Sequence, residues 1–308
     1  MDEQSLYFST VLGFFLFVLS ATVVESQKQP LISALYIFGD STIDPGNNNC
    51  LATIAKANFP PYGRDFPNGQ PTGRFTNGRL VTDLISELLG LPDLLPASLD
   101  PEFQGEKLLT GASFGSSGSG YADCTANSNN VMPLEKQVDN FRHYKAQLSN
   151  MVDQKHASEI VSEALFCIST GTDDFILNYY FNSLTRMKYS VQQFEDLLLQ
   201  SLSGFIQNVK SEGGRRLAVI GLPPFGCLPS QITLHNFIGN TCVEEFNEVA
   251  RSFNRKIKAL VENKKLHYPG LRIAYLDIYN KLADMIRFPS KYGFEEVRKG
   301  CCGTGLLE

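Results

Sequence analysis

The sequence predicts a single α/β domain built around a mostly parallel sheet. Short apolar runs of strand length alternate with longer segments whose apolar residues recur at helical spacing, a pattern typical of βαβ units. The chain has 308 residues and is 43% hydrophobic, which is enough to bury the core of one large domain. No repeat, charge run or change of composition divides it.

Five apolar runs are the candidate strands. They are rich in aromatic and β-branched residues, and turn-forming or polar residues separate them from the segments that follow. The runs are 35–38, a short one within 108–114, 165–169, 217–220 and 273–276.

Three segments between these runs carry apolar residues on one helical face. They are 80–89, which stops at Gly90, then 191–209 and 243–261. The aromatic residues at helical spacing in the last two indicate packing against a core rather than a cofactor or lipid site. We expect these helices to flank the sheet.

The N-terminus contains the one strongly apolar run, residues 11–24, which is too short to span a bilayer comfortably. It is followed by a polar stretch, so we interpret 1–26 as a secretory signal peptide and 27–308 as the single domain. Asp2 and Glu3 stand where basic residues are usual, and a retained signal anchor is the alternative. We expect a secreted, extracellular protein with no transmembrane segment in the mature chain.

Seven cysteines fit an oxidising compartment, although their number is odd. Cys227 and Cys242 flank a modest loop and are the expected disulfide. Cys167 lies in an apolar strand and is expected to be a buried free thiol.

Charge and motif content exclude several function classes. A net charge of −5 disfavours nucleic acid or an anionic membrane as a main partner. The cysteines lack Cys-x-x-Cys spacing, the histidines do not cluster, and no phosphate-binding loop or dinucleotide fingerprint is present. We therefore expect no metal and no cofactor.

A serine follows the first candidate strand directly, in Gly39-Asp40-Ser41. Such a serine lies at the carboxyl edge of a sheet, where open α/β folds bind ligands. Its hydroxyl is a weak nucleophile unless a base takes its proton. An ordinary turn that caps a helix explains these few residues equally well.

Longer blocks distinguish these alternatives. Gly39-Asp40-Ser41 continues as "STIDPGNNN", and "LLTGASFGSSGSGYADCTA", "STGTDDFILNYY", "VIGLPPFGCLPSQ" and "KYGFEEVRKGCCGTGLLE" follow in order. Together they resemble the plant GDSL esterase/lipase family, a branch of the SGNH hydrolases, over nearly all of the chain after residue 31. The resemblance implies a three-layer, flavodoxin-like fold with a mostly parallel five-stranded sheet. It also implies hydrolysis of carboxylic esters, including those of lipids, through a serine acyl-enzyme.

The resemblance assigns roles to two residues without difficulty. Ser41 matches the nucleophile, and its own backbone N–H is one expected oxyanion donor. Gly118 matches the second-block glycine, whose N–H points at the oxyanion; Gly115 and Gly120 are competing registers, and a flexible Gly/Ser loop is the structural alternative. Asp40 is expected to shape the turn.

The third block departs from the family at Asp173, where the family pattern Gly-x-Asn-Asp has asparagine. An ionised Asp173 has no donor for the oxyanion, and loss of one such donor typically lowers turnover by roughly 10²–10³. A protonated carboxyl group donates, but only with a strongly raised pKa. The alternative is a strand-end carboxylate that caps the next helix.

The family's last block, Asp-x-x-His, supplies the base and its orienting carboxylate and lies beyond the "CCGTG" segment. This sequence stops at Glu308, so we expect a C-terminally incomplete domain. Asp153 and His156 reproduce the spacing, but they fall between the second and third blocks in polar surroundings. We expect no histidine within hydrogen-bond reach of Ser41.

Two functions remain from these observations. The first is a secreted serine esterase/lipase, of which this sequence is a shortened version. The alternative is a catalytically impaired pseudoenzyme or ester-binding protein without the base histidine, and a remnant that does not fold stably is a third reading. The acyl and alcohol portions of the substrate stay open.

Overall fold

The computed structural model describes residues 30–236 and 241–300, and from Ile32 onward these residues belong to one structural unit, Ile32–Glu308. Its strands are β1 (Leu35–Gly39), β2 (Gly111–Ser113), β3 (Leu165–Ser169), β4 (Arg216–Ile220) and β5 (Arg272–Leu276). Its α-helices are α2 (Val81–Leu88), α3 (Asp123–Ser128), α4 (Leu134–Val152), α5 (Gln154–Glu163), α6 (Ser183–Lys188), α7 (Val191–Ser211), α8 (Pro229–Asn236), α9 (Glu244–His267) and α10 (Tyr279–Arg287).

The five strands form one parallel sheet in the order β2-β1-β3-β4-β5, which confirms the predicted fold class. The chain passes from β1 outward to β2 and then crosses back to β3 on the other side of β1. Connections therefore leave in opposite directions from the carboxyl ends of β1 and β3, where such folds bind ligands. Gly39 pairs with Ser169 at this end.

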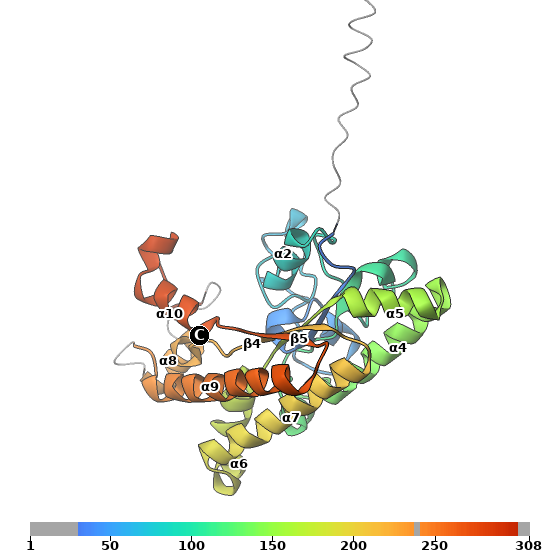
Figure 1. The fold of residues 1–308 in the computed structure, drawn as a ribbon. Coiled ribbons are helices and arrows are strands. Elements are labelled where there is room, and N and C mark those ends of the chain that lie inside the picture. The colour runs from blue at the N-terminus through green and yellow to red at the C-terminus, as the bar shows by residue number, and fades with distance from the viewer. Residues whose placement is uncertain (1–29, 237–240, 301–308) are drawn as a thin grey trace, which may run out of the picture. The chain divides into compact units, whose positions relative to one another are not determined.

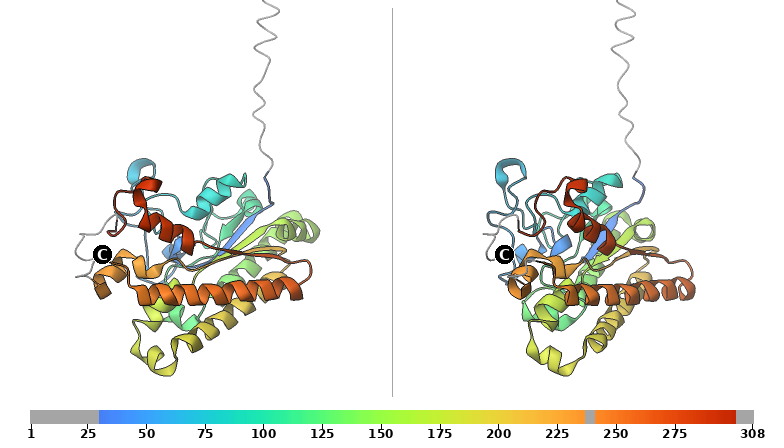
Figure 2. Two further views of the ribbon diagram at one scale, coloured as in Figure 1. Left: turned by 60° about the vertical axis from the view of Figure 1, so that its left-hand side comes forward. Right: turned by 90° about the vertical axis from the view of Figure 1, so that its left-hand side faces the viewer.

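Helices cover both faces of the sheet (Figures 1 and 2). Side chains of α4, α7 and α9 pack on one face around Tyr36, Phe38 and Phe166. The other face carries a smaller cluster, in which Leu35 and Ile37 pack with the residues around α2. The layered arrangement explains why these strands read as continuous apolar runs.

The apolar stripes of α7 and α9 are buried as predicted, but α2 differs. It buries Thr82, Asp83 and Ser86, while Leu84 and Leu88 are exposed. The cause is an ion pair of Asp83, described below, which draws the polar face of the helix inward.

Cys227 and Cys242 form the expected disulfide, and Cys167 is a buried free thiol. Burial raises the pKa of the Cys167 thiol to about 12. No helix within the described ranges is long and apolar enough to cross a membrane. The expected signal peptide lies outside the described residues.

Candidate active site

Ser41 lies directly beyond β1, as the first residue of a short 3-10 helix, Ser41–Ile43, and it is half-buried. Asp40 caps this helix: its carboxylate accepts hydrogen bonds from the backbone N–H of Thr42 at 3.0 Å and from the Thr42 hydroxyl at 2.8 Å. The carboxylate therefore holds the turn that presents Ser41 at the carboxyl edge of the sheet.

The end of β1 is bound tightly to the end of β3. The backbone N–H of Asp40 donates to the carbonyl oxygen of Ser169 at 3.2 Å, and the hydroxyls of Thr42 and Ser169 are 3.1 Å apart. Gly39 has a φ of +140°, and a Cβ at this position would lie 1.8 Å from the Ser169 carbonyl oxygen. Only glycine allows the two strand ends to approach this closely.

Gln137 of α4 joins the end of β1 to the glycine block, by which we mean residues 108–126 with Gly115, Gly118 and Gly120. Its Oε1 accepts the Gly39 N–H at 2.8 Å, while its Nε2 donates to the Gly39 carbonyl oxygen at 2.9 Å and to the Ser119 hydroxyl at 3.2 Å. The Ser116 N–H also donates to the Gly39 carbonyl at 2.9 Å. Sequence reasoning missed Gln137, although a glutamine on the buried face of α4, between Leu134 and Phe141, was a usable signal.

The residues after Ser41 hold the glycine block from the other side. The Asp44 carboxylate accepts the Ser117 N–H at 3.1 Å, and the Asn47 amide donates to the carbonyl oxygens of Ser113 and Gly115 at 2.9 and 2.8 Å. The Asn48 amide donates to the Ser117 carbonyl at 3.0 Å. The polar "DPGNNN" stretch therefore supports the loop that carries Gly118.

The three candidate glycines differ in their surroundings. A Cβ on Gly115 would lie 1.8 Å from the Ile43 side chain, and one on Gly120 would lie 2.3 Å from the Asp174 carboxylate. Both positions need glycine for packing. Gly118 has a φ of +83°, and its backbone N–H faces the Asp173 carboxyl group.

Asp173 therefore lies next to Gly118 and close to Asp40, the residue before Ser41. Partial burial raises the pKa of Asp173 well above its usual range, the neighbouring Asp40 and Asp174 raise it further, and the Gly118 N–H opposes the shift. Although Asp173 stands at the N-terminus of the following helix, its side chain makes no capping hydrogen bond there.

Asp174 is fully buried and clamps the glycine block to the end of β3. Its carboxylate accepts the backbone N–H groups of Tyr121 at 2.6 Å and Ala122 at 3.1 Å, and the Thr125 hydroxyl at 2.6 Å. Burial raises the pKa of Asp174 to about 7, despite these donors. It begins a π-helix, Asp174–Tyr179; such helices are rare and are frequent at functional sites.

Asp40 is the third carboxyl group at this edge. Burial raises its pKa, whereas hydrogen bonds from Thr42 and Thr170 lower it. Across the part of the chain that the structure describes, no lysine or arginine forms an ion pair with Asp40, Asp173 or Asp174.

All four histidines are exposed on helices of the structure. His143 on α4 and His267 on α9 contact carbonyl oxygens of their own helices through Nδ1, and the His235 ring on α8 packs against Phe246. His156 lies in the first turn of α5, where the Asp153 carboxylate accepts its backbone N–H at 2.9 Å. The Asp-x-x-His spacing at this place is thus a helix cap.

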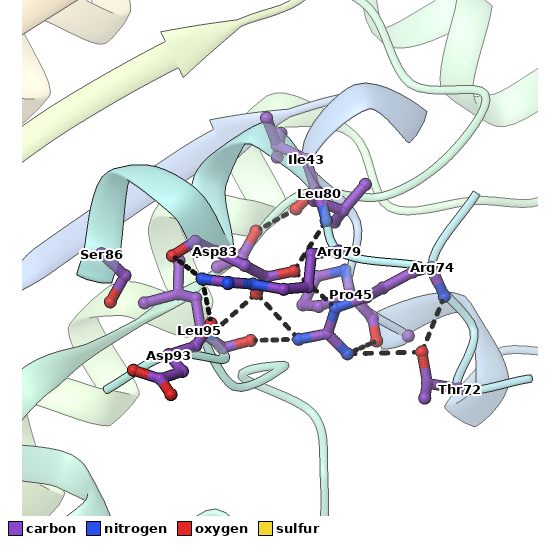
Figure 3. A network of polar contacts seen from close by, with 12 residues as sticks. Ile43, Pro45, Thr72, Arg74, Arg79, Leu80, Asp83, Ser86, Asp93 and Leu95 are labelled. Carbon is purple, nitrogen blue, oxygen red and sulfur yellow. Dashed lines mark hydrogen bonds and ion pairs between the residues drawn. The ribbon is translucent and has the colours of Figure 1, made fainter. Parts of the chain in front are cut away.

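A buried ion pair fixes the long loop, residues 60–78, which leads into α2 (Figure 3). Arg74 donates to both oxygens of the Asp83 carboxylate, at 2.8 and 3.0 Å, and to the carbonyl oxygens of Leu95 and Pro45 at 3.0 and 3.4 Å. Asp83 also accepts the Leu80 N–H at 2.7 Å. Sequence reasoning missed this network, because a charged pair nine residues apart in a loop and a helix has no recognisable pattern.

Comparison with known proteins agrees with this architecture. A family model described as GDSL-like lipase/acylhydrolase matches residues 35–307. The chain is 43% identical to the Arabidopsis thaliana GDSL esterase/lipase At5g45960, across 92% of this chain and 77% of that protein. It is 43% identical to GDSL esterase/lipase APG, across 94% and 82%, and 45% identical to GDSL esterase/lipase At5g03810, across 91% and 80%, both from the same plant. The Arabidopsis thaliana GDSL esterase/lipase At4g26790 is 41% identical, across 97% of this chain and 85% of that protein. The chain belongs to the GDSL-like lipase/acylhydrolase family and, by that membership, to the carboxylic-ester hydrolases.

Proposed function

We propose that the protein is a secreted esterase in which Ser41 attacks the carbonyl carbon of a carboxylic ester. The Ser41 oxygen forms the new bond and gives up its proton, the C–O bond of the ester breaks, and the alcohol leaves with a proton. Water then hydrolyses the acyl-enzyme and releases the acid. One observation carries this proposal: hydrogen bonds to Gly39 and Asp40 join the ends of β1 and β3 and the glycine block directly before Ser41.

The oxyanion would be bound by the backbone N–H groups of Ser41 and Gly118. Among the three candidate glycines, Gly118 is favoured because its N–H is directed towards the neighbouring strand end, whereas Gly115 and Gly120 are accounted for by packing. Asp173 would supply the third donor, as a protonated carboxyl group.

The distribution of donors supports protonation at Asp173 rather than at Asp40. The Asp40 carboxylate receives hydrogen bonds from Thr42 and Thr170, which favour its charged form. Among the described residues, Asp173 receives the Gly118 N–H alone, and it faces the charge of Asp40. Two close carboxyl groups with unequal partners share their protons unequally, so the proton resides on Asp173.

Secretion is part of the proposal. The apolar run at 11–24 supports a signal peptide over 1–26, followed by a single domain over 27–308. The disulfide between Cys227 and Cys242 supports an oxidising, extracellular location.

A second candidate function is an ester-binding protein with impaired catalysis. The observation that favours it is the exposure of His143, His156, His235 and His267, none of which is hydrogen-bonded to Ser41 within the described ranges. Without a base, the Ser41 hydroxyl remains a weak nucleophile.

A fluorophosphonate probe and a p-nitrophenyl butyrate assay separate the two candidates. The esterase is expected to incorporate one probe per chain at Ser41 and to release p-nitrophenol, and Ser41→Ala should lose both, whereas Ser158→Ala on α5 should lose neither. Slow turnover with intact binding of the ester supports the second candidate. Turnover that survives Ser41→Ala contradicts both assignments of this residue.

A further inference from the structure

The segment after Asp174 exposes apolar side chains that a helix of a globular domain normally buries. Four of them, three or four residues apart, are Leu177, Phe181, Leu184 and Met187, with exposed fractions of 41%, 85%, 70% and 82%. They lie in and around α6, which projects beyond α7 in Figures 1 and 2. We call these four residues, with Arg186 and Lys188, the α6 tip. Contiguous exposed apolar groups mark interaction sites more often than isolated ones do.

The inner side of this segment is firmly packed, so the exposed side chains are held outward. Tyr179 is buried, with its ring centroid 5.2 Å from that of Phe194. The Thr185 hydroxyl donates to the Asn178 side-chain oxygen at 2.7 Å. Arg186 donates to the carbonyl oxygen of Tyr180. The α6 tip is therefore a fixed feature of the surface.

The charge of the α6 tip is opposite to that of the chain. The whole chain carries −5, yet residues 175–194 contain Arg186 and Lys188 and neither aspartate nor glutamate. Both cations are exposed, and the Lys188 ammonium lies 5.0 Å from the centre of the Tyr189 ring. Apolar groups combined with cations are the composition that proteins use at the surface of anionic lipid aggregates.

We propose that the α6 tip docks on the surface of an anionic lipid aggregate, with Phe181, Leu184 and Met187 inserted among the acyl chains. Arg186 and Lys188 then meet the phosphate or carboxylate groups of the lipid heads. The tip begins four residues after Asp173, so docking brings the carboxyl edge of the sheet to water-insoluble esters. This link to catalysis rests on the proposed esterase function, whereas the docking itself does not.

A second copy of the chain fits this surface less well. A two-fold symmetric contact apposes the same patch on both copies, which would place Arg186 and Lys188 of one copy near those of the other without an acidic partner in the patch. A lipid surface instead supplies both the apolar interior and the negative charge.

Vesicle co-sedimentation tests the docking. The triple variant Phe181→Ser, Leu184→Ser and Met187→Ser should partition onto vesicles of phosphatidylcholine with phosphatidylserine at least about 10-fold more weakly than wild type. The matched control is the double variant Leu88→Ser and Leu266→Ser, whose side chains are 79% and 81% exposed on α2 and α9. It should bind like wild type.

Charge is tested separately with Lys188→Gln. This variant should lose about fivefold in binding to the mixed vesicles and nothing on vesicles of phosphatidylcholine alone. Far-ultraviolet circular dichroism and turnover of a soluble ester should be unchanged in all these variants, because they alter exposed side chains only. Turnover of a long-chain ester held in the mixed vesicles should fall with the triple variant.

Two results overturn the proposal: the triple variant binds vesicles as tightly as wild type, or light scattering shows a wild-type dimer that the triple variant dissociates. Ser41→Ala separates docking from function, since it should bind vesicles normally. If the wild type binds vesicles but hydrolyses no ester, the proposed esterase function is contradicted and the docking proposal is still supported.

Discussion

Asp83 and Asp174 are both fully buried, but they are neutralised in different ways. Asp83 forms a two-pronged ion pair with Arg74, beneath the long loop. Asp174, at the strand ends, receives only N–H and hydroxyl donors from the described residues and has the carboxyl groups of Asp40 and Asp173 nearby. The first arrangement fixes a loop, whereas the second keeps three carboxyl groups close together, and their raised pKa values mean a cost in stability when they are ionised. Such cost is typical of functional sites, where perturbed pKa values concentrate.

The largest effect is expected from breaking the buried ion pair between Arg74 and Asp83. Asp83→Ala leaves the Arg74 guanidinium buried without its partner, and loss of one member of a buried pair typically lowers the free energy of unfolding by about 3–5 kcal/mol. Urea denaturation measures this loss. Glu87→Ala is the matched control, since Glu87 pairs with Arg79 at the surface at 2.6 Å, and an exposed pair contributes at most about 1 kcal/mol. Equal losses for the two variants would refute the contrast.

The second effect concerns ester turnover and the carboxyl group of Asp173, which lies with Asp40 and Asp174 at the strand ends. If Asp173 donates to the oxyanion only when protonated, ester turnover should fall as pH rises through its raised pKa. Asp173→Asn donates at every pH, so the decline should vanish and turnover above that pKa should exceed wild type by roughly 10²–10³. Below it the two proteins should be similar. Turnover of wild type and of Asp173→Asn, measured across the pH range, tests both expectations. Identical pH profiles for the two proteins would exclude a protonated Asp173 donor.

An independent measurement reads the proton itself. Infrared difference spectra should contain the C=O stretch of a protonated carboxylic acid at neutral pH in the wild type, and Asp173→Asn should remove intensity from it. This readout does not depend on a base for Ser41. If the wild-type spectrum lacks that intensity, Asp173 is ionised at neutral pH and offers no donor to the oxyanion, so slow turnover is expected.

A smaller effect is expected in the pH dependence of stability. The raised pKa of Asp174, about 7, means that the folded state holds a proton which the unfolded state releases near its ordinary value. The free energy of unfolding should therefore fall as pH rises between about 4 and about 7, by at most about 1.4 kcal/mol per pH unit for this group. Asp174→Asn should remove that fall.

Asp284 provides the control of opposite sign. Hydrogen bonds from Tyr292 and Lys291 hold the pKa of Asp284 below its ordinary value, so this carboxylate stabilises the fold as pH rises. Asp284→Asn should shift the slope in the direction opposite to Asp174→Asn. Denaturation curves across the pH range measure both, and parallel slopes for wild type and Asp174→Asn would contradict the assignment.

The sequence predicted the sheet and the position of Ser41 because both follow from local patterns. Apolar runs define strands, and a turn after the first of them places its serine at the carboxyl edge. Residues that act over long separations were harder: Gln137 contacts Gly39 across 98 positions and Asp174 contacts Tyr121 across 53. Their partners are set by the strand order, which periodicity does not encode.

The orientation of α2 was missed for a related reason. Its apolar residues suggested a buried stripe, but the pairing of Asp83 with Arg74 turned the polar face inward. The raised pKa of Asp173 likewise depends on its burial and on Asp40 and Asp174 being nearby, which only the folded chain decides.

The smallest effect is expected from the histidines. His143, His156, His235 and His267 are exposed and make their contacts on their own helices or with Phe246, so replacing each with glutamine should change the turnover of a soluble ester less than about twofold. Added imidazole should accelerate wild type as an external base and should not accelerate Ser41→Ala. Steady-state assays over a range of imidazole concentrations measure this. A large loss with His156→Gln would make the Asp153-His156 pair the catalytic base, and would place it at the carboxyl edge instead of at the helix cap that it forms in this structure.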